Sequence, residues 1–359
     1  MSEFIKKLER DFNIELIESN LPIEDKHTYS VDMFGNIVAL YLEEVKLQHL
    51  HRLSPIAKHL RVLSLIECEI KNIEGIKTFT RLEELDLSRN RISKLEEITT
   101  LSCLKKLVLG CIDINSIEGL ECLKCLKVLD LDGNKIDNID NICAIPSLKT
   151  LLLNGCGISQ ITGLERFPRL EVLDLGNNPI AGIKGFEKMN QLRELSLSSS
   201  QITKIEGLNH LETLETLDLS SNRILQLQGL NNLSQLKELN LAYNPIEQIK
   251  GLENLLNLEV LILHFNEIRK IENIPSHSLK YLYLSCNLIE EIDEELIFLE
   301  ELHLAGNQIK EFDTEWLYKI KGKCLITLAH NPLKEIKGRV PDNITIQLKP
   351  SEYTPPFLP

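Results

Sequence analysis

The sequence predicts an α/β solenoid, in which one short unit of strand and turn is repeated and stacked. The first observation is the stretch LNLAYNPIEQI, where Leu239 and Leu241 alternate as in a strand and Asn244 follows. The second is that Leu or Ile stands two residues after Asn244 and after every equivalent position. The third is the period, close to 22 residues, with which the position of Asn244 recurs: 45, 68, 90, 112, 134, 156, 178, 200, 222, 244, 266, 287, 307 and 331.

This period and the spacing L-x-x-L-x-L-x-x-N/C-x-L are the signature of a leucine-rich repeat. One repeat cannot bury its apolar face alone, so the Leu-x-Leu strands must stack and share a core. We therefore expect a horseshoe-shaped solenoid whose concave wall is a parallel sheet of about 14 rungs, one strand per repeat. The convex segments, such as IEGLNHLETL, are too short for long helices and are predicted to be extended or to form short helical or 3-10 turns.

The recurring position, which we call the ladder position, carries a residue that can bond to backbone groups left unpaired by the bend after each strand. Cys68, Cys156 and Ser200 stand there in three repeats, whereas Val45 and Ile112 leave the turn to find other partners. Asparagine occupies it in the other nine: Asn90, Asn134, Asn178, Asn222, Asn244, Asn266, Asn287, Asn307 and Asn331.

Three segments are predicted. Residues 1–36 form an N-terminal cap, with an amphipathic helix in EFIKKLERDF and a hairpin that turns at Met33, Phe34 and Gly35. A cap is needed because the first strand would otherwise present an open edge; the alternative is a separate docking module. Residues 37–336 form the solenoid, and residues 337–359 add a closing strand with Ile344 and a proline-rich tail, SEYTPPFLP, either a closing end or a ligand for a partner's groove.

Near the C-terminal end of the solenoid the repeat spacings become irregular. Asp313 or Thr314 is predicted to cap a helix with the sequence EWLYKIK, which Gly322 would end.

Composition limits the partners. The net charge of −13 argues against nucleic acid as a partner, and the sequence has no run of 18 apolar residues that would indicate a membrane span. The first residues, MSEFIKKLERDF, are charged throughout and do not resemble a secretion signal, so we expect a cytoplasmic protein. We also expect the protein to be a monomer by itself. The nine scattered cysteines favour reduced thiols. Cys122 and Cys125 form a CxxC, with Cys103 expected beside Cys125 on the outer face, but no second pair completes a zinc site, so we expect neither a metal nor another cofactor.

The middle residues of the strands must point to the concave, solvent-facing side because the leucines that flank them point inward. In repeats three to nine this side is acidic, and from repeat ten onward it carries aromatic residues and histidines. Such aromatic residues either anchor a protein partner or pack against the C-terminal end of the solenoid. The acidic set is Glu84, Asp86, Asp130, Asp132, Asp174, Glu194 and Asp218, and the second set is Tyr243, His264, Phe265, Tyr281, Tyr283, His303 and His330.

From Leu40 to about Ile336 the chain resembles the 22-residue class of leucine-rich-repeat proteins, which includes the regulatory subunit of protein phosphatase 1. The resemblance implies a binding scaffold that presents its concave face to another protein. The chain departs from the phosphatase subunit in its C-terminal end and in lacking an acidic leader. The helix and hairpin that run into IVALYL look more like the start of prokaryotic or archaeal repeat proteins.

The sequence therefore predicts a non-catalytic scaffold that binds a partner protein, with a basic surface, on its concave face. The first alternative is a regulatory subunit of a phosphatase or other signalling enzyme. The second is a metal-dependent enzyme that uses His264, His303 and His330 together with Asp218 or Glu301. The sequence shows no Gly-rich phosphate loop, nucleophile elbow or HExxH motif, which disfavours catalysis.

Overall fold

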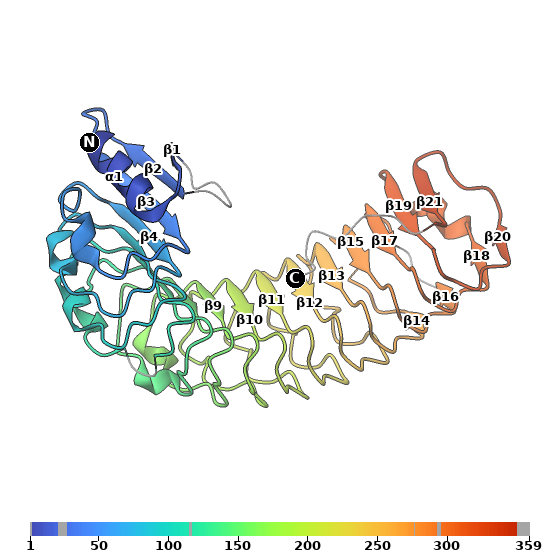
Figure 1. Cartoon of the computed structure of the whole chain (residues 1–359). Coiled ribbons are helices and arrows are strands. Elements are labelled where there is room, and N and C mark those ends of the chain that lie inside the picture. The colour runs from blue at the N-terminus through green and yellow to red at the C-terminus, as the bar shows by residue number, and fades with distance from the viewer. Residues whose placement is uncertain (1, 21–26, 115–116, 276, 293–295, 350–359) are drawn as a thin grey trace. The chain divides into compact units, whose positions relative to one another are not determined.

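The computed structural model describes residues 2–20, 27–114, 117–275, 277–292 and 296–349. The chain forms two compact units, Met1–Asn178 and Pro179–Pro359, and each is a stack of repeats with one strand per repeat (Figure 1). The predicted leucine-rich-repeat solenoid is confirmed, with repeats one to seven in the first unit and eight to fourteen in the second. The predicted domain boundaries at residues 36 and 336 remain predictions.

The first unit begins with the helix α1 (Ser2–Phe12), whose Ile5 and Leu8 are buried. The strand β1 (Leu16–Glu18) pairs in parallel with β2 (His27–Val31), and β2 pairs antiparallel with β3 (Ile37–Glu43), the strand of the first repeat. The turn between β2 and β3 is held by Asp32, whose carboxylate accepts the N–H groups of Phe34 and Asn36. The predicted helix and hairpin are therefore both present. Residues 21–26, between β1 and β2, lie outside the described residues.

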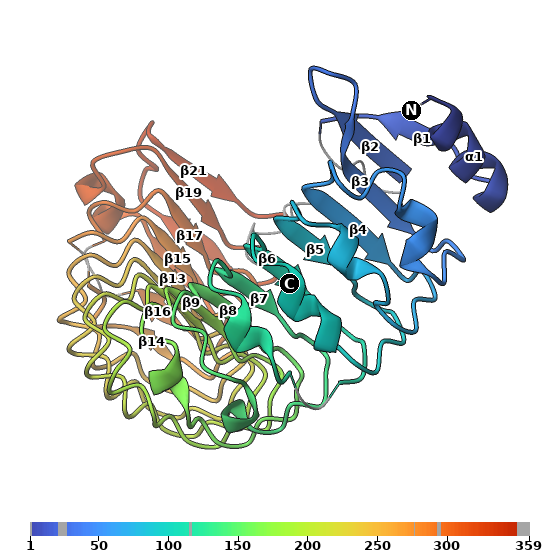
Figure 2. The ribbon, with the colours of Figure 1, turned by 90° about the vertical axis from the view of Figure 1, so that its left-hand side faces the viewer.

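The remaining strands of the first unit pair in parallel, one repeat with the next, as Figure 2 shows for β3 to β9. They are β4 (Val62–Ile66), β5 (Glu84–Asp86), β6 (Lys106–Val108), β7 (Val128–Asp130), β8 (Thr150–Leu152) and β9 (Val172–Asp174). The outer segments form the predicted 3-10 turns: η1 (Leu50–Leu53), η2 (Ile76–Thr78), η3 (Glu96–Thr100), η4 (Leu120–Cys122), η5 (Ile139–Asn141) and η6 (Leu164–Arg166).

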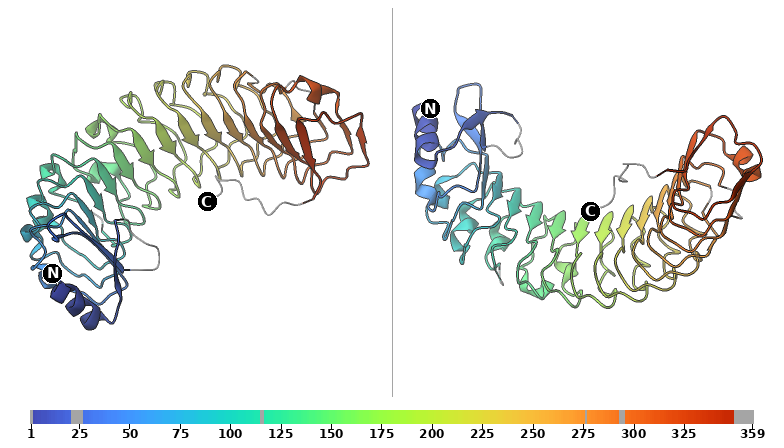
Figure 3. Two further views of the ribbon diagram at one scale, coloured as in Figure 1. Left: turned by 90° about the horizontal axis from the view of Figure 1, so that it is seen from above. Right: turned by 45° about the vertical axis from the view of Figure 1, so that its right-hand side comes forward.

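The second unit continues the pattern with seven parallel repeat strands and one closing strand, drawn from two further sides in Figure 3. They are β10 (Glu194–Ser196), β11 (Thr216–Asp218), β12 (Glu238–Asn240), β13 (Val260–Ile262), β15 (Tyr281–Tyr283), β17 (Glu301–His303), β19 (Cys324–Thr327) and β21 (Ile344–Gln347). Two outer pairs are parallel as well: β14 (Lys270–Ile271) with β16 (Glu291–Ile292), and β18 (Glu311–Asp313) with β20 (Glu335–Lys337).

The helix predicted for EWLYKIK is wrong in type and length. The segment forms a 3-10 helix, η7 (Glu315–Lys319), which ends three residues before Gly322. Thr314 is its N-cap by position, but its hydroxyl donates to Lys337 O at 2.9 Å and Arg339 O at 3.1 Å, and Asp313 accepts the N–H of Glu315 instead. Strand pairing between β18 and β20 therefore competes with a longer helix at this point. The proline-rich tail lies outside the described residues.

The ladder asparagines connect each repeat to the one before it. In Asn244, the carboxamide donates to Leu219 O at 3.0 Å in the preceding repeat and to Leu241 O at 3.1 Å in its own, and its oxygen accepts the N–H of Ile224 at 3.0 Å. The other asparagines repeat this arrangement, and eight of the nine are buried, Asn331 being half-buried. Cys68 and Cys156 replace the amide with a thiol that donates to the same kind of backbone oxygen, and burial raises their pKa to about 12 and about 11.

The residue just before each ladder position adopts a left-handed conformation, with φ between 50° and 71° in all fourteen repeats. This bend aims its N–H at the next repeat; for example, the N–H of Tyr243 donates to His264 O at 2.9 Å. Glycine adopts this geometry freely and asparagine at low cost, whereas the Cβ atom of other residues costs roughly 1 to 2 kcal/mol. The sheet therefore ends at a position whose backbone favours glycine or asparagine, although Glu67, Arg89 and His330 stand there as well.

Substituting a buried ladder asparagine should lower the free energy of unfolding more than substituting an exposed asparagine. Asn222→Ala or Asn244→Ala removes the partners of buried backbone groups and should cost about 1 to 3 kcal/mol each. Asn209→Ala, at an exposed outer position in the same unit, should cost less than about 0.5 kcal/mol. Urea unfolding of the three variants checks this, and equal losses of stability would contradict the assigned roles.

Removing the N-terminal residues should expose a strand edge. A chain that begins at residue 37 loses β2, so the backbone groups of β3 that pair with β2 become open to another chain. We expect self-association or fraying from that end, measured by sedimentation velocity and by melting. A chain lacking only residues 1–12 keeps β2 and serves as the control. The cap interpretation fails if the shorter chain stays monomeric and melts at the temperature of the full chain.

Candidate functional site

The sheet face, meaning the solvent side of the repeat strands, carries the predicted acidic residues in the first unit. Asp86, Asp130 and Asp174 stand at the ends of β5, β7 and β9, two strands apart and thus roughly 10 Å from one to the next. Each is half-buried, and each accepts the N–H of the residue two places further along, at 2.8–3.0 Å. These aspartates therefore shape the turn after the strand as well as giving it charge, a role that the sequence analysis missed.

The pKa values of two acidic residues on this face, Asp130 and Asp132, are raised. Burial raises the pKa of Asp132 to about 6, although its oxygen accepts the N–H of Asn154 at 2.7 Å, and Asp130 and Asp174 raise it further. Burial also raises the pKa of Asp130, with the charges of Asp86 and Asp174 acting in the same direction. Lys106 partly offsets the effect on Asp130, whereas no cation among the described residues lowers the pKa of Asp132, so the sheet face is acidic around this residue.

In the second unit the sheet face becomes aromatic. Tyr243 and Phe265, in neighbouring repeats, stack with ring centroids 4.4 Å apart and an angle of 9° between the rings. They are 46% and 44% exposed. Both occupy the left-handed position before the ladder, with φ of 56° and 54°, where the backbone favours glycine or asparagine. The backbone at this position therefore gives no reason for two aromatic side chains.

Beside the pair lies an apolar cluster that we call the floor: Ala242, Val260, Ile262 and Tyr283, with Tyr281 packed against it. Three predicted contact residues are buried here, His264 at 5%, Tyr283 at 2% and His303 at 7% exposure, so they support the surface from within. Tyr283 packs between the two imidazoles, at 5.5 Å from His264 and 4.8 Å from His303. These three residues pack against one another in neighbouring repeats, and Tyr243, Phe265 and Tyr281 stay at the surface. The binding role of the surface residues remains a prediction.

The histidines have structural partners. Nδ1 of His264 accepts the N–H of Ser285 at 3.0 Å, and burial lowers the pKa of His264 to about 4, with the charge of His303 acting in the same direction. Nε2 of His303 lies 3.0 Å from a carboxylate oxygen of Glu301. His330 is exposed, two repeats beyond the floor. The described residues hold no group of three or more His, Cys, Asp or Glu side chains arranged to bind a metal ion.

Acidic residues border the floor. At the first residue of successive strands the pairing runs Glu194, Thr216, Glu238, Val260, Tyr281 and Glu301, so carboxylates stand on both sides of the apolar centre. Glu238 is half-buried, and burial raises its pKa, with Glu194 and Glu259 adding to the effect. At the residue before each strand, by contrast, acids are neutralised, since Glu215 pairs with Arg193 and Lys237 at 2.6 Å each.

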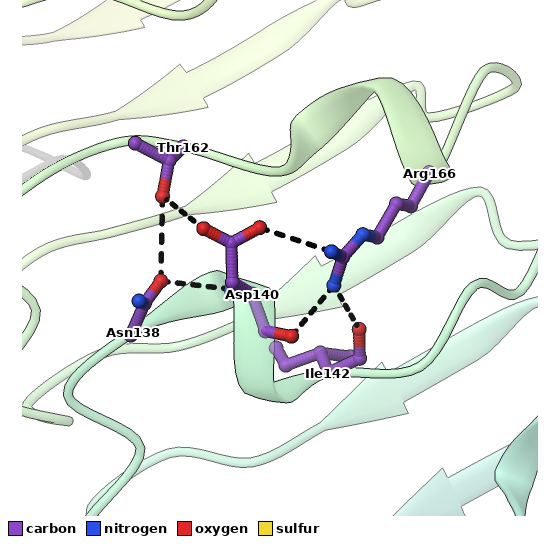
Figure 4. Close-up of polar contacts among 5 residues, drawn as sticks. All are labelled: Asn138, Asp140, Ile142, Thr162 and Arg166. Atoms are coloured by element: carbon purple, nitrogen blue, oxygen red, sulfur yellow. Dashed lines mark hydrogen bonds and ion pairs between the residues drawn. The ribbon is translucent and has the colours of Figure 1, made fainter.

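The outer side shows a different kind of polar cluster, drawn in Figure 4. Arg166 donates to the backbone oxygens of Asp140 and Ile142, and its second nitrogen lies 3.1 Å from the carboxylate of Asp140. Thr162 donates to the same carboxylate at 2.9 Å and to Asn138 Oδ1 at 3.3 Å. These bonds join the turn containing η5 to the segment that leads into η6, so the cluster stabilises the stacking of two repeats.

The cysteines of the CxxC lie on this outer side too. Cys103, Cys122 and Cys125 are exposed, and none of the nine cysteines forms a disulfide. Among the described residues, no helix has both the length and the apolar character needed to cross a lipid bilayer.

The sequence matches two family models. The model described as leucine-rich repeats in two copies matches residues 58–103 and, in overlapping segments, residues 146–276, and a single-copy leucine-rich-repeat model matches residues 125–145. Together they cover more than half of the chain. The protein belongs to the leucine-rich-repeat family.

Solved structures with the same fold come from different sources. An internalin, InlF, from Listeria monocytogenes is 23% identical, covers 85% of this chain and 90% of its own, and gives a TM-score of 0.68. A leucine-rich-repeat protein of Leptospira interrogans is 24% identical over 83% and 88% of the two chains, with a TM-score of 0.63. The FLRT2 repeat domain, solved in an octameric complex with latrophilin 3 and Unc5D, is 20% identical over 69% and 84%, with a TM-score of 0.61. At these identities the likeness establishes the fold. A comparison with curated protein sequences found no match.

The raised pKa of Asp132 makes a prediction for stability. The folded state holds the proton more tightly than an unfolded aspartate, whose pKa is about 3.9, so the ionised carboxylate costs stability above pH 6 and the cost disappears between about pH 6 and pH 4. Asp132→Asn should stabilise the chain at pH 7, by about 1 kcal/mol once solvent screening of a half-exposed group is allowed for. Thermal melting at pH 7 and pH 4 checks this, since the gain should be absent at pH 4. A loss of stability at pH 7 would show that the charge is compensated.

Proposed function

We propose that this protein is a non-catalytic scaffold that binds another protein on the sheet face. The observation that carries the proposal is the stacked pair Tyr243 and Phe265, two exposed rings at a backbone position that favours glycine or asparagine. Strained or costly residues that the fold does not need indicate selection for something outside the fold. Exposed, rigid aromatic rings are also the side chains that contribute most to protein interfaces.

The family supports this class of function. The FLRT2 repeat domain was solved in a complex with two other proteins, which is a property of that protein. Structural relatives of this chain show the fold serving as a platform for protein contacts, and a repeated sheet offers many side chains on one wall. The catalytic alternative is disfavoured because His264 and His303 are buried and bonded to neighbouring groups.

The acidic sheet face of the first unit adds a finer proposal, that the partner presents a basic surface. Asp86, Asp130 and Asp174 would act on such a partner before contact, since charges spaced by about 10 Å act together over the Debye length of roughly 10 Å at 0.1 M salt. The identity of the partner as a phosphatase or other signalling enzyme remains the alternative proposal, supported by the sequence resemblance alone.

We also propose an intracellular location. Nine free cysteines, three of them exposed together on the outer side of the first unit, suit a reducing compartment. Maleimide labelling of the protein in intact source cells, compared with a lysate, tests this; labelling by a membrane-impermeant reagent in intact cells would contradict it.

The proposed function predicts a division of kinetic effects. The triple change Asp86→Asn, Asp130→Asn and Asp174→Asn should slow association with the partner, more at low than at high salt, because it removes steering charge. It should leave the fold intact, since Asn240 already makes the same turn bond, accepting the N–H of Ala242 at 3.1 Å. The double change Tyr243→Asn and Phe265→Asn should raise the dissociation rate about thirtyfold, which corresponds to about 2 kcal/mol.

The controls for this prediction are Glu212→Lys and Lys124→Glu, two exposed outer positions. The partner is first captured from source lysate and purified, and rates are then measured by surface plasmon resonance. If the outer variants weaken binding and the sheet-face variants do not, the partner uses the other side of the repeats and the proposed function site is wrong.

A further inference from the structure

The surface of the second unit also indicates what kind of segment it binds. We propose that the row Glu238, Val260, Tyr281 and Glu301, on the same sheet face as the Tyr243–Phe265 pair, binds an extended stretch of a partner protein in which one apolar residue, proline included, lies between two basic residues about four positions apart. This inference rests on the proposed function, because it specifies the partner at the same site.

The apolar component follows from the centre of this row. Val260 belongs to the floor, and the half-buried Tyr281 packs against it. The floor is packed and buried, so it does not rearrange to receive a ligand. A preorganised apolar surface of this kind favours an apolar side chain that can lie against it at small entropic cost. The rings of Tyr243 and Phe265 lie further along the same sheet face, at the bends after β12 and β13.

The basic component follows from the bordering carboxylates. Glu238, on β12, crowds with Glu194 and Glu259, and the described residues give Glu238 no ion-pair partner. Glu259 is already paired with Lys280 at 2.7 Å, so the excess charge stays with Glu238 and Glu194. On the other side of the floor, Glu301 binds only the His303 ring and the Tyr283 hydroxyl among the described groups. A cationic side chain on each side would relieve this charge.

The spacing follows from the register. Glu238, Val260, Tyr281 and Glu301 are paired residues of four successive strands, β12, β13, β15 and β17, which lie side by side in Figure 1. Three strand spacings of about 4.8 Å separate Glu238 from Glu301 by roughly 14 Å. An extended chain advances about 3.3 Å per residue, so about four residues cover this distance, with the apolar residue in the middle. A helix, which rises 1.5 Å per residue, would need nine or ten.

The test is a selection from a phage-displayed library of random 12-residue peptides on the immobilised full chain. Peptides that also bind a Tyr281→Ser variant are removed, and that variant must stay folded, as its melting curve shows. The expected consensus is Lys or Arg, three intervening residues of which the central one is apolar, then Lys or Arg. A consensus without basic residues overturns the inference but leaves the proposed function standing. If no peptide survives this removal, and the peptides that bind the parent chain are lost with Glu212→Lys or Lys124→Glu, both the inference and the proposed function are overturned.

Two further arms sharpen the result, with the best selected peptide as probe. Glu238→Lys should weaken its binding at least tenfold at 0.1 M salt, whereas Glu247→Lys, at an exposed outer position of the same repeat, should not change it. Equal effects of the two changes overturn the inference. Basic residues nine or ten positions apart would show a helical occupant and overturn the extended geometry. If a synthetic peptide with the sequence of residues 350–359 displaces the probe at comparable affinity, the occupant is a segment of this chain, and the inference is wrong.

Discussion

The buried carboxamide of the ladder asparagine is the interaction on which the rest of the structure depends. It satisfies two or three backbone oxygens and at least one backbone N–H at once, in its own repeat and in the preceding one. Unpaired, these groups would each carry the cost of a buried polar group. The bond therefore fixes the bend after each strand and the distance between repeats together. Where a thiol takes the place, at Cys68 and Cys156, the donor role is kept, and the asparagine of the next repeat still receives the N–H groups.

Fixing the bend has a consequence for the sheet face. The residue before the ladder is forced into the left-handed region in every repeat, and its side chain is set on the solvent side, apart from the leucine core. The core then constrains this residue only through its backbone. Serine, glycine, cysteine, asparagine, arginine and histidine all occur there in this chain, as do tyrosine and phenylalanine. Sequence at this position is thus free to serve contacts with other molecules, at the small cost of an unfavourable φ.

The periodicity of the sequence predicted the solenoid, the parallel register and the ladder. Leucines that recur at the same place in every repeat are buried together when the repeats stack in register. The hairpin at Asp32 and Gly35 and the closing strand at Ile344 were predictable from local turn and strand chemistry. The 3-10 form and the early end of the helix at Glu315 were not predictable, because β18 and β20 pair through residues distant in the sequence and take up Thr314. Which aromatic residues stay exposed was not predictable either. Tyr243 and Tyr283 were both predicted to be contact residues. Tyr243 stands on the left-handed bend and is exposed, whereas Tyr283 stands on a strand between two imidazoles and is buried.

The repeat geometry turns sequence positions into rows, and this is what gives the candidate site its chemistry. Residues that occupy the same place in successive repeats become neighbours across strands, about 4.8 Å apart. A row in which acids are interrupted by Val260 and Tyr281 is therefore an apolar centre between two carboxylates, although Glu238 and Glu301 are 63 residues apart in the chain. In the neighbouring row, formed by the residues just before the strands, two acids are neutralised. Glu215 forms ion pairs with Arg193 and Lys237, and Glu259 forms one with Lys280. Two rows with the same backbone thus differ in whether their charge is neutralised within the chain, and the row that keeps its negative charge is the one that contains Val260 and Tyr281.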